Sequence, residues 1–254
     1  IRLNTLNKYV DQFIIVEATI DHAGNEKKLN FDIKNFIKFK DKINYLVIED
    51  VPKKVKSLRK NWHPAHTRDQ FQRNSLERGY KNFNEDDLIM ISDIDEIPNP
   101  KKISEFNIKN KYACFIQKNF QVRLNRLNST EQNWPGTKIC QKKFLKSPQW
   151  LRNIKTKKRK IWNFYKDKEP QIILDGGWHF SFLKKNEQIL RKIKSFAHQE
   201  FNTDNLTSLE GIENRVNLGV DIFERQYQYK KIQLDESFPE YILENRSKFK
   251  DWII

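Results

Sequence analysis

The feature that most constrains this chain is an apolar segment that runs directly into a cluster of carboxylates. In DDLIMISDIDEIPNP (residues 86–100), the apolar run that begins at Leu88 leads into Asp93, Asp95 and Glu96, and two prolines follow. Like charges held this close repel one another, and fixing them together costs stability unless a cation or solvent relieves the repulsion. The segment therefore predicts a buried strand whose end presents carboxylates to a cation.

Composition sets broader limits. With 254 residues the chain is long enough for one large α/β domain with a real core. Its 48 Lys and Arg against 33 Asp and Glu give a net charge of +15, which favours a polyanionic or phosphate-bearing partner. Abundant lysine on a solvated surface would give the same balance. The two cysteines are too few for a disulfide framework or a metal knuckle.

No apolar run reaches the ~18 residues that a membrane span needs, and no signal peptide is recognisable. Together with the cysteine usage, this leads us to expect a cytoplasmic protein. A lumenal catalytic domain whose anchor had been removed would look the same.

The order of expected elements indicates the fold class. Buried strands are predicted over Val10–Ala18, Lys42–Val51 and Leu88–Ser92, with a helix over Ala65–Tyr80. This alternation predicts an α/β fold with a mostly parallel central sheet flanked by helices. The strand-like stretches Tyr112–Val122 and Thr137–Leu145 predict a small antiparallel part.

The C-terminal part is mainly helical by its pattern, after a strand over Gln171–Leu183 that Gly176 and Gly177 interrupt. One helix has Ile189, Ile193, Phe196 and Ala197 on one face, with Asn186 as its cap, and a second covers Leu209–Arg225. We see no repeat, linker or second domain, so we expect a single domain over residues 1–254.

Open sheets of this kind bind ligands beyond the carboxyl ends of their strands, where Glu17 and the acidic cluster are expected. Asp93-x-Asp95 suits Mg²⁺ or Mn²⁺, ions that commonly bridge to substrate phosphates; a solvated turn is the alternative. In GGWHFSF, His179 lies between aromatic residues. A histidine there is more often a packed core residue, but it is also a candidate third ligand, because imidazole suits Mn²⁺ better than Mg²⁺.

Several segments together resemble glycosyltransferase family 17. They occur in the family's order over roughly residues 1–245: VDQFIIVEATIDHAGNEKKLNF, FQRNSLERG, LIMISDIDEIP, WPGTKIC, GGWHFSF and SFAHQEF. The family includes the animal enzyme that adds the bisecting N-acetylglucosamine to N-glycans. The resemblance implies a GT-A fold, a nucleotide-sugar donor, UDP-linked in the family, and a Mn²⁺ or Mg²⁺ ion held by the D-x-D.

The resemblance also implies roles for particular residues. Asp93, Asp95 and His179 would hold the metal and the donor diphosphate. A donor-side group would comprise Glu17, His22, Gly24, Lys27, Arg73 and Asn74, although Arg73 reads equally well as part of a helix-surface ion pair. Trp134 and Trp178 would contact the sugar or the acceptor, with core packing as the alternative for Trp178.

The implied reaction inverts the anomeric carbon of the donor sugar, with N-acetylglucosamine as the sugar that the resemblance suggests and a glycan hydroxyl as acceptor. Such a reaction needs a general base, for which Glu200 is the first candidate and Glu96 its rival. The basic stretch Lys142–Lys168 would guide an anionic acceptor or form a solvated loop. The chain departs from the family where a first strand would precede IRLNTL, and where Asp21 replaces a threonine.

Two other functions fit parts of the sequence. ISDIDEI faintly resembles the strand of haloacid-dehalogenase-like phosphatases, in which Asp93 would be the nucleophile and Asp95 the acid. A basic module that binds a polyanion would use the positive charge and the aromatics. Since the acidic cluster would repel a polyanion in the absence of a metal, we expect no nucleic-acid partner.

Overall fold

A computed structural model describes residues 1–52, 64–157, 168–195 and 198–254. They form two units, each assembled from separate stretches of the chain. The first unit comprises Ile1–Tyr9, Phe83–Leu183 and Gln226–Ile254, and the second comprises Val10–Asn82 and Lys184–Arg225. The single domain over residues 1–254 stays a prediction.

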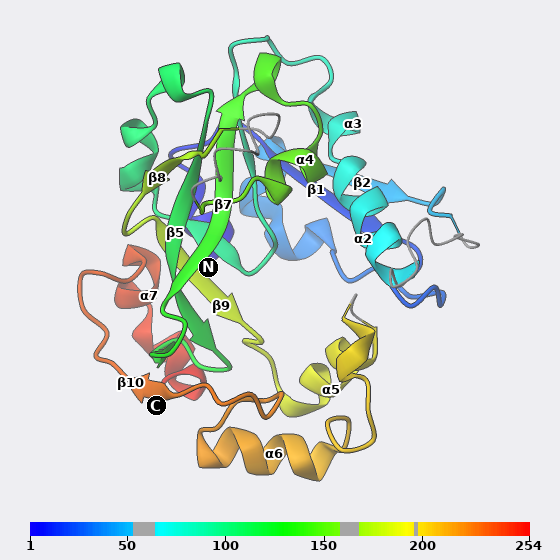
Figure 1. Cartoon of the computed structure of the whole chain (residues 1–254), viewed down its shortest axis with the longest axis vertical. Helices are drawn as coiled ribbons and strands as arrows, with labels where there is room; N and C mark the ends of the chain where they lie inside the picture. Colours follow the sequence, from blue (N-terminus) through cyan, green and yellow to red (C-terminus); the bar gives the residue numbers. More distant parts are fainter. Residues whose placement is uncertain (53–63, 158–167, 196–197) are drawn as a thin grey trace. The chain divides into compact units, whose positions relative to one another are not determined.

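The sheet of the first unit is built around β5 (Tyr112–Gln121), the long green strand in Figure 1. Along β5, β7 (Asn133–Gln141) runs antiparallel, as the sequence predicted, whereas β8 (Gln171–Ile173) and β9 (Gly177–Ser181) run parallel. The remaining pairs are antiparallel: β3 (Leu88–Ile91) with β7, β4 (Glu96–Pro98) with β9, β6 (Arg126–Asn128) with β5, and β10 (Tyr229–Lys231) with β6.

The expected mostly parallel central sheet is therefore wrong for this unit. Its described strands form more antiparallel pairs than parallel ones, and the antiparallel part is the larger. The strand that ends in the acidic cluster pairs with β7, a strand about fifty positions later. Apolar composition predicts that a segment is buried, but it does not specify which strand lies beside it.

The expected parallel arrangement is found for the first two predicted strands, in the second unit. There β1 (Phe13–Ala18) and β2 (Ile43–Ile48) are parallel, with Phe13 opposite Ile43. They form a separate two-stranded sheet. Glu17 and the acidic cluster thus lie in different sheets, and the expectation that they share one sheet edge is also wrong.

Glycine allows β9 to approach β4 closely. Gly177 has φ +130°, and a Cβ on it would lie 2.1 Å from the carbonyl oxygen of Ile97. No side chain fits at that distance, so this position requires glycine. The close approach places β4 and β9 in register, with Glu96 opposite His179.

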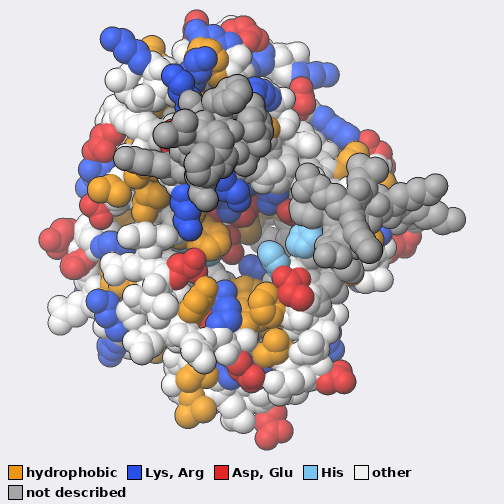
Figure 2. Space-filling model, viewed as in Figure 1, with side chains coloured by type: hydrophobic (Ala, Val, Ile, Leu, Met, Phe, Trp, Pro, Cys, Tyr) orange, Lys and Arg blue, Asp and Glu red, His pale blue; other side chains and the backbone are white. Residues whose placement is uncertain are grey.

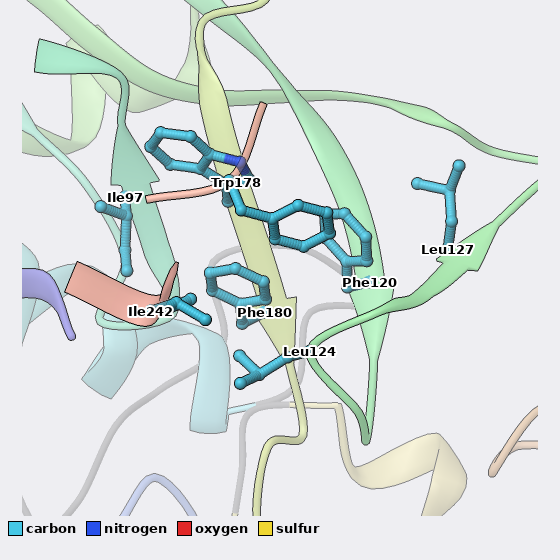
Figure 3. Close-up of a cluster of buried hydrophobic side chains, with 8 residues drawn as sticks. Ile97, Phe120, Leu124, Leu127, Trp178, Phe180 and Ile242 are labelled. Carbon is cyan, nitrogen blue, oxygen red and sulfur yellow. The ribbon is translucent and has the colours of Figure 1, made fainter. Parts of the chain in front are cut away.

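One apolar cluster of the first unit lies on the face that β4, β5 and β9 share (Figure 3). Phe120 and Phe180 pack with ring centroids 5.3 Å apart, and Trp178 and Ile242 are buried beside them. Ile242 comes from α7 (Glu240–Glu244), which thereby covers this face. In this cluster, aromatic rings provide much of the buried area.

The helix α4 (Pro148–Asn153) begins where the sequence provides a cap. The Ser147 side chain accepts a hydrogen bond from the Trp150 amide, and Pro148 occupies the first turn, where no amide donor is required. The other described helical segments of the first unit are α1 (Arg2–Leu6) and four 3₁₀ segments over Pro100–Glu105, Ile108–Asn110, Lys142–Phe144 and Arg246–Trp252, the last following α7.

The second unit is helical apart from β1 and β2. It contains a 3₁₀ segment over Ile33–Lys42, α2 (Pro64–Asn74), α3 (Glu77–Tyr80), α5 (Asn186–Ser195), a 3₁₀ turn over Gln199–Phe201 and α6 (Leu209–Leu218). The side chain of Ser208 caps α6, and Gly219 ends it with φ +70°. The predicted helix of residues 65–80 is interrupted between α2 and α3. Phe196 and Ala197, predicted for the face of α5, lie outside the described residues.

Across the described ranges, no helix has both the length and the apolar character that a membrane span requires.

Candidate active site

The acidic cluster forms the short loop that joins β3 to β4. Asp93 and Asp95 lie in the loop itself, and Glu96 is the first residue of β4. Because Glu96 pairs with His179 across β4 and β9, strand register brings this loop to an imidazole eighty-odd positions away in the sequence. The amide of Phe180 also donates to the Asp95 carbonyl at 2.9 Å. The loop is thus fixed to β9 by backbone hydrogen bonds.

The imidazole of His179 faces Asp95 with its Nε2 and Asn119 with its Nδ1. Its Nε2 lies 3.8 Å from Asp95 Oδ1, and its Nδ1 lies 3.1 Å from Asn119 Oδ1. The Asn119 amide is oriented by its Nδ2, which donates to the Glu131 carbonyl. Asn119 Oδ1 is therefore an acceptor and His179 Nδ1 donates to it, which in the neutral imidazole leaves the lone pair on Nε2, the nitrogen nearer Asp95.

The indole of Trp134 links His179 to Glu96. Its ring stacks on the His179 imidazole with centroids 4.4 Å apart and planes 19° apart. Its Nε1 donates to Glu96 Oε1 at 2.8 Å. Trp134 thus holds the orientation of the imidazole and one oxygen of the buried carboxylate at the same time.

Glu96 is fully buried and its carboxylate accepts several hydrogen bonds. Besides Trp134, its donors are Arg152 Nη2 at 2.7 Å and the Asp93 amide at 3.2 Å. Burial raises the pKa of Glu96 to about 7, opposed by the Arg152 guanidinium and assisted by the negative charge of Asp93. The geometry makes Glu96 a side chain that shapes the loop.

Two arginines that sequence reasoning missed support the same loop. Arg152, in the last turn of α4, bridges Asp93 Oδ2 at 3.0 Å and Glu96 Oε1 at 2.7 Å. Arg2 donates from its Nη1 to the carbonyl oxygens of Asp93 and Glu96. Arg152 belongs to the basic stretch Lys142–Lys168, part of which lies outside the described residues, and no local signal separates it from the neighbouring cations. Its role depends on where α4 packs.

The residues at Asp95 and His179 fit a divalent ion. Two ligands of one ion at about 2.1 Å lie ~3 Å apart in adjacent positions and ~4 Å apart in opposite ones, a range that includes the observed 3.8 Å. Carboxylate oxygen with one imidazole nitrogen suits Mn²⁺. Asp93 is also part-exposed, but its Oδ2 already accepts from Arg152.

Trp178 is placed differently from Trp134. It is only 5% exposed, belongs to the apolar cluster of Figure 3, and its Nε1 donates to the Ser237 carbonyl at 2.9 Å. The core-packing alternative is therefore the one that the structure supports.

In the second unit, the carboxylate of Glu17 is enclosed by donors. It accepts from Lys27 Nζ, the Tyr45 hydroxyl, the amides of Asn30 and Phe31, and the Asn30 side chain. Lys27, one of the predicted donor-side residues, is thus paired with Glu17 in this structure.

The other predicted donor-side residues of this unit lie around α2. The carbonyl of His22 accepts from Arg68 at 3.0 Å, and a Cβ on Gly24 (φ +102°) would lie 2.8 Å from the Arg68 guanidinium. Arg73 pairs with Asp69 one helical turn away at 2.9 Å, as the ion-pair alternative expected. Asn74 is the last residue of α2.

Glu200 lies in the 3₁₀ turn Gln199–Phe201 and is exposed. Its Oε1 accepts from His198 Nδ1 at 2.8 Å. Partial burial acts to raise the pKa of Glu200, but hydrogen bonds and the nearby imidazoles outweigh it, and the pKa lies below its ordinary value.

Comparison with known proteins identifies the family. Searches of curated proteins and of solved structures return no match. A family model, described as Glycosyltransferase family 17, matches residues 1–252. Because this match covers essentially the whole chain and includes both sides of the Asp95–His179 pair, the chain belongs to glycosyltransferase family 17.

Proposed function

We propose that this glycosyltransferase is metal-dependent and inverting, and that it moves a sugar from a nucleoside diphosphate to a hydroxyl of a glycan. The observation that carries the proposal is the Asp95–His179 pair, in which a carboxylate oxygen and an imidazole nitrogen lie 3.8 Å apart at a strand end. Family membership supports a sugar donor and an acceptor. UDP-N-acetylglucosamine is the donor that we would test first.

We assign Asp95 and His179 as the metal ligands and Asp93 as a further ligand or a donor contact. Mn²⁺ bound there would act as a Lewis acid that neutralises charge on the departing diphosphate. The chain's own residues prepare the site: Asn119 fixes the His179 tautomer, Trp134 fixes its ring plane, and Arg152 offsets the repulsion within the acidic loop. Side chains that are already in place lose little freedom when the donor binds.

For the general base we propose Glu200 rather than Glu96. A base must come within hydrogen-bond reach of the acceptor hydroxyl. Glu200 is exposed and its partner His198 can orient it, whereas Glu96 has no exposed surface and three donors already surround it. The role of Glu96 is then to position Trp134 and Arg152.

Charge distribution does not favour the polyanion-binding alternative. On the face that Figure 2 shows, the described acidic side chains are interspersed with the described Lys and Arg side chains, which form no continuous basic stripe there. Nonspecific binding of nucleic acid requires a continuous positive track along the phosphate backbone. The phosphatase alternative has no support from the family match.

The direct test is donor turnover with and without Mn²⁺. We expect Mn²⁺-dependent release of UDP from one UDP-sugar of a panel, and at least 100-fold less from Asp95→Asn at an unchanged melting temperature. Glu200→Gln should keep Mn²⁺-dependent UDP binding and lose transfer. Asp86→Asn is the matched control, because Asp86 is an exposed acid just before the same strand, paired with Lys143. Full activity of Asp95→Asn would contradict the proposal.

A further inference from the structure

A second group of metal-ligating side chains lies in the second unit. His66 is near the start of α2. His198 lies just before the 3₁₀ turn Gln199–Phe201, and Glu200 lies within it. One ligand atom from each of the three residues lies within 4.8 Å of the others. Segments more than 130 positions apart in the sequence thus bring two imidazoles and a carboxylate together.

Within this group, the potential ligand atoms of the three side chains surround a common point. The rings of His66 and His198 meet edge to face, with centroids 5.4 Å apart and planes 78° apart. His198 Nδ1 lies 2.8 Å from Glu200 Oε1. Adjacent ligands of a tetrahedral ion at about 2.0–2.1 Å are separated by ~3.4 Å, so shifts of an ångström or so would bring all three atoms onto one ion. The exposure of His198 and Glu200 leaves room for water at a fourth position.

We propose that His66, His198 and Glu200 form a binding site for a transition-metal ion of the Zn²⁺ class. Two nitrogens and one carboxylate oxygen are a ligand set that selects Zn²⁺, Co²⁺ or Ni²⁺ over Mg²⁺ and Ca²⁺, which prefer oxygen ligands. This set is richer in nitrogen than the Asp95–His179 pair, so the two sites should differ in the metal that they prefer.

Binding at this site has a consequence that rests on the proposed function. Glu200 is the proposed base, and a carboxylate that coordinates Zn²⁺ has its lone pair engaged and cannot take a proton from the acceptor. Zn²⁺ should therefore inhibit transfer while Mn²⁺ supports it.

The test measures binding separately from activity. The full chain carrying Asp95→Asn, which weakens the other site, is titrated with Co²⁺ and Zn²⁺ by visible absorption and calorimetry. We expect one Co²⁺ per chain with the absorption of a four-coordinate ion, displaced by Zn²⁺. His66→Ala and His198→Ala should each weaken Zn²⁺ binding at least tenfold, because even the loss of an outer-shell partner costs roughly 10–100-fold.

His22→Ala is the matched control, since His22 is a histidine of the same unit outside the group, with its Nε2 facing Asp69 at 3.9 Å. It should leave Zn²⁺ affinity unchanged. If a histidine variant lowers the melting temperature of the metal-free chain, His66→Gln and Glu200→Gln replace it. Unchanged Zn²⁺ affinity in both histidine variants, or no Zn²⁺ binding at all, would overturn the site.

An inhibition assay on the unmutated chain then separates the two proposals. Zn²⁺ that binds through His66 and His198 but does not inhibit transfer supports the metal site and removes Glu200 as the base. Zn²⁺ that inhibits equally in the unmutated chain and in His66→Ala acts elsewhere and counts against this site.

Discussion

Two buried glutamates, one in each unit, have pKa values that are shifted in opposite directions. Glu17 is 8% exposed and Glu96 is fully buried, and both accept several hydrogen bonds. Burial acts to raise the pKa of Glu17, but hydrogen bonds from Lys27, Asn30 and Phe31 outweigh it and lower the pKa to about 2. Burial raises the pKa of Glu96 to about 7 even with Arg152 beside it.

The difference comes from the deeper burial of Glu96 together with the neighbours of each carboxylate. Around Glu17 every contact is a donor or a cation, so its charge stabilises the loop that follows β1. Around Glu96, the carboxylates of Asp93 and Asp95 add repulsion, which the Arg152 guanidinium opposes. A carboxylate that stabilises the fold is surrounded by donors, whereas an acidic group built to receive a cation retains unrelieved negative charge. The three predictions below test that contrast.

The largest effect is expected from Arg152→Met. Removing one partner of a buried ion pair leaves an uncompensated charge and typically costs about 3–5 kcal/mol, so we expect a loss of ~3 kcal/mol in the free energy of unfolding. The control is Arg78→Met, because Arg78 pairs with Asp50 at 2.7 Å on the surface, where a pair contributes about 0–1 kcal/mol. Equal losses in the two variants, measured by urea unfolding at pH 7, would show that Arg152 is an ordinary surface cation.

Glu17→Gln is expected to lower the free energy of unfolding by a smaller amount. The pH dependence of this loss tests whether the Glu17 carboxylate stabilises the fold. The pKa of Glu17 is lower in the folded chain, so its contribution is present above pH 4.5 and is lost as the pH falls toward 2. We expect Glu17→Gln to cost about 2 kcal/mol at pH 7 and progressively less in acid.

For Glu96→Gln, the change in the free energy of unfolding should vary with pH in the opposite direction. Because the folded-state pKa of Glu96 is raised, its favourable contribution is present below pH 4.5 and is lost as the pH rises toward 7. Relative to the unmutated chain, Glu96→Gln should therefore gain stability with rising pH as Glu17→Gln loses it. Parallel slopes in the two variants would remove the contrast between the two sites.

Much of the local structure could be predicted from the sequence. The apolar runs that became β1, β2 and β3 start and end within three residues of the predicted bounds, because β-branched and apolar runs favour strands. The interruption predicted at Gly176 and Gly177 is confirmed, since β8 ends at Ile173 and β9 begins at Gly177. Resemblance to the family associated His179 with Asp95, and the structure places them close together.

Other features depended on packing that no local pattern records. Strand composition did not reveal that β3 pairs antiparallel with β7. Arg152 reaches the acidic loop only because α4 packs where it does, and Asn119 faces His179 because β5 and β9 pair in one particular register. Long-range register and helix placement follow from the packing of the whole core. The cations and amides that support a site are therefore the residues that are hardest to predict from the sequence.

The most direct test of the central claim is pulsed electron paramagnetic resonance of Mn²⁺ bound to the chain in the presence of UDP. If Asp95 and His179 hold the ion, the echo should be modulated by one directly bound ¹⁴N nucleus. That modulation should disappear in His179→Gln and persist in His198→Gln. A bound Mn²⁺ whose nitrogen modulation survives the loss of His179, or which shows none in the unmutated chain, would contradict the account.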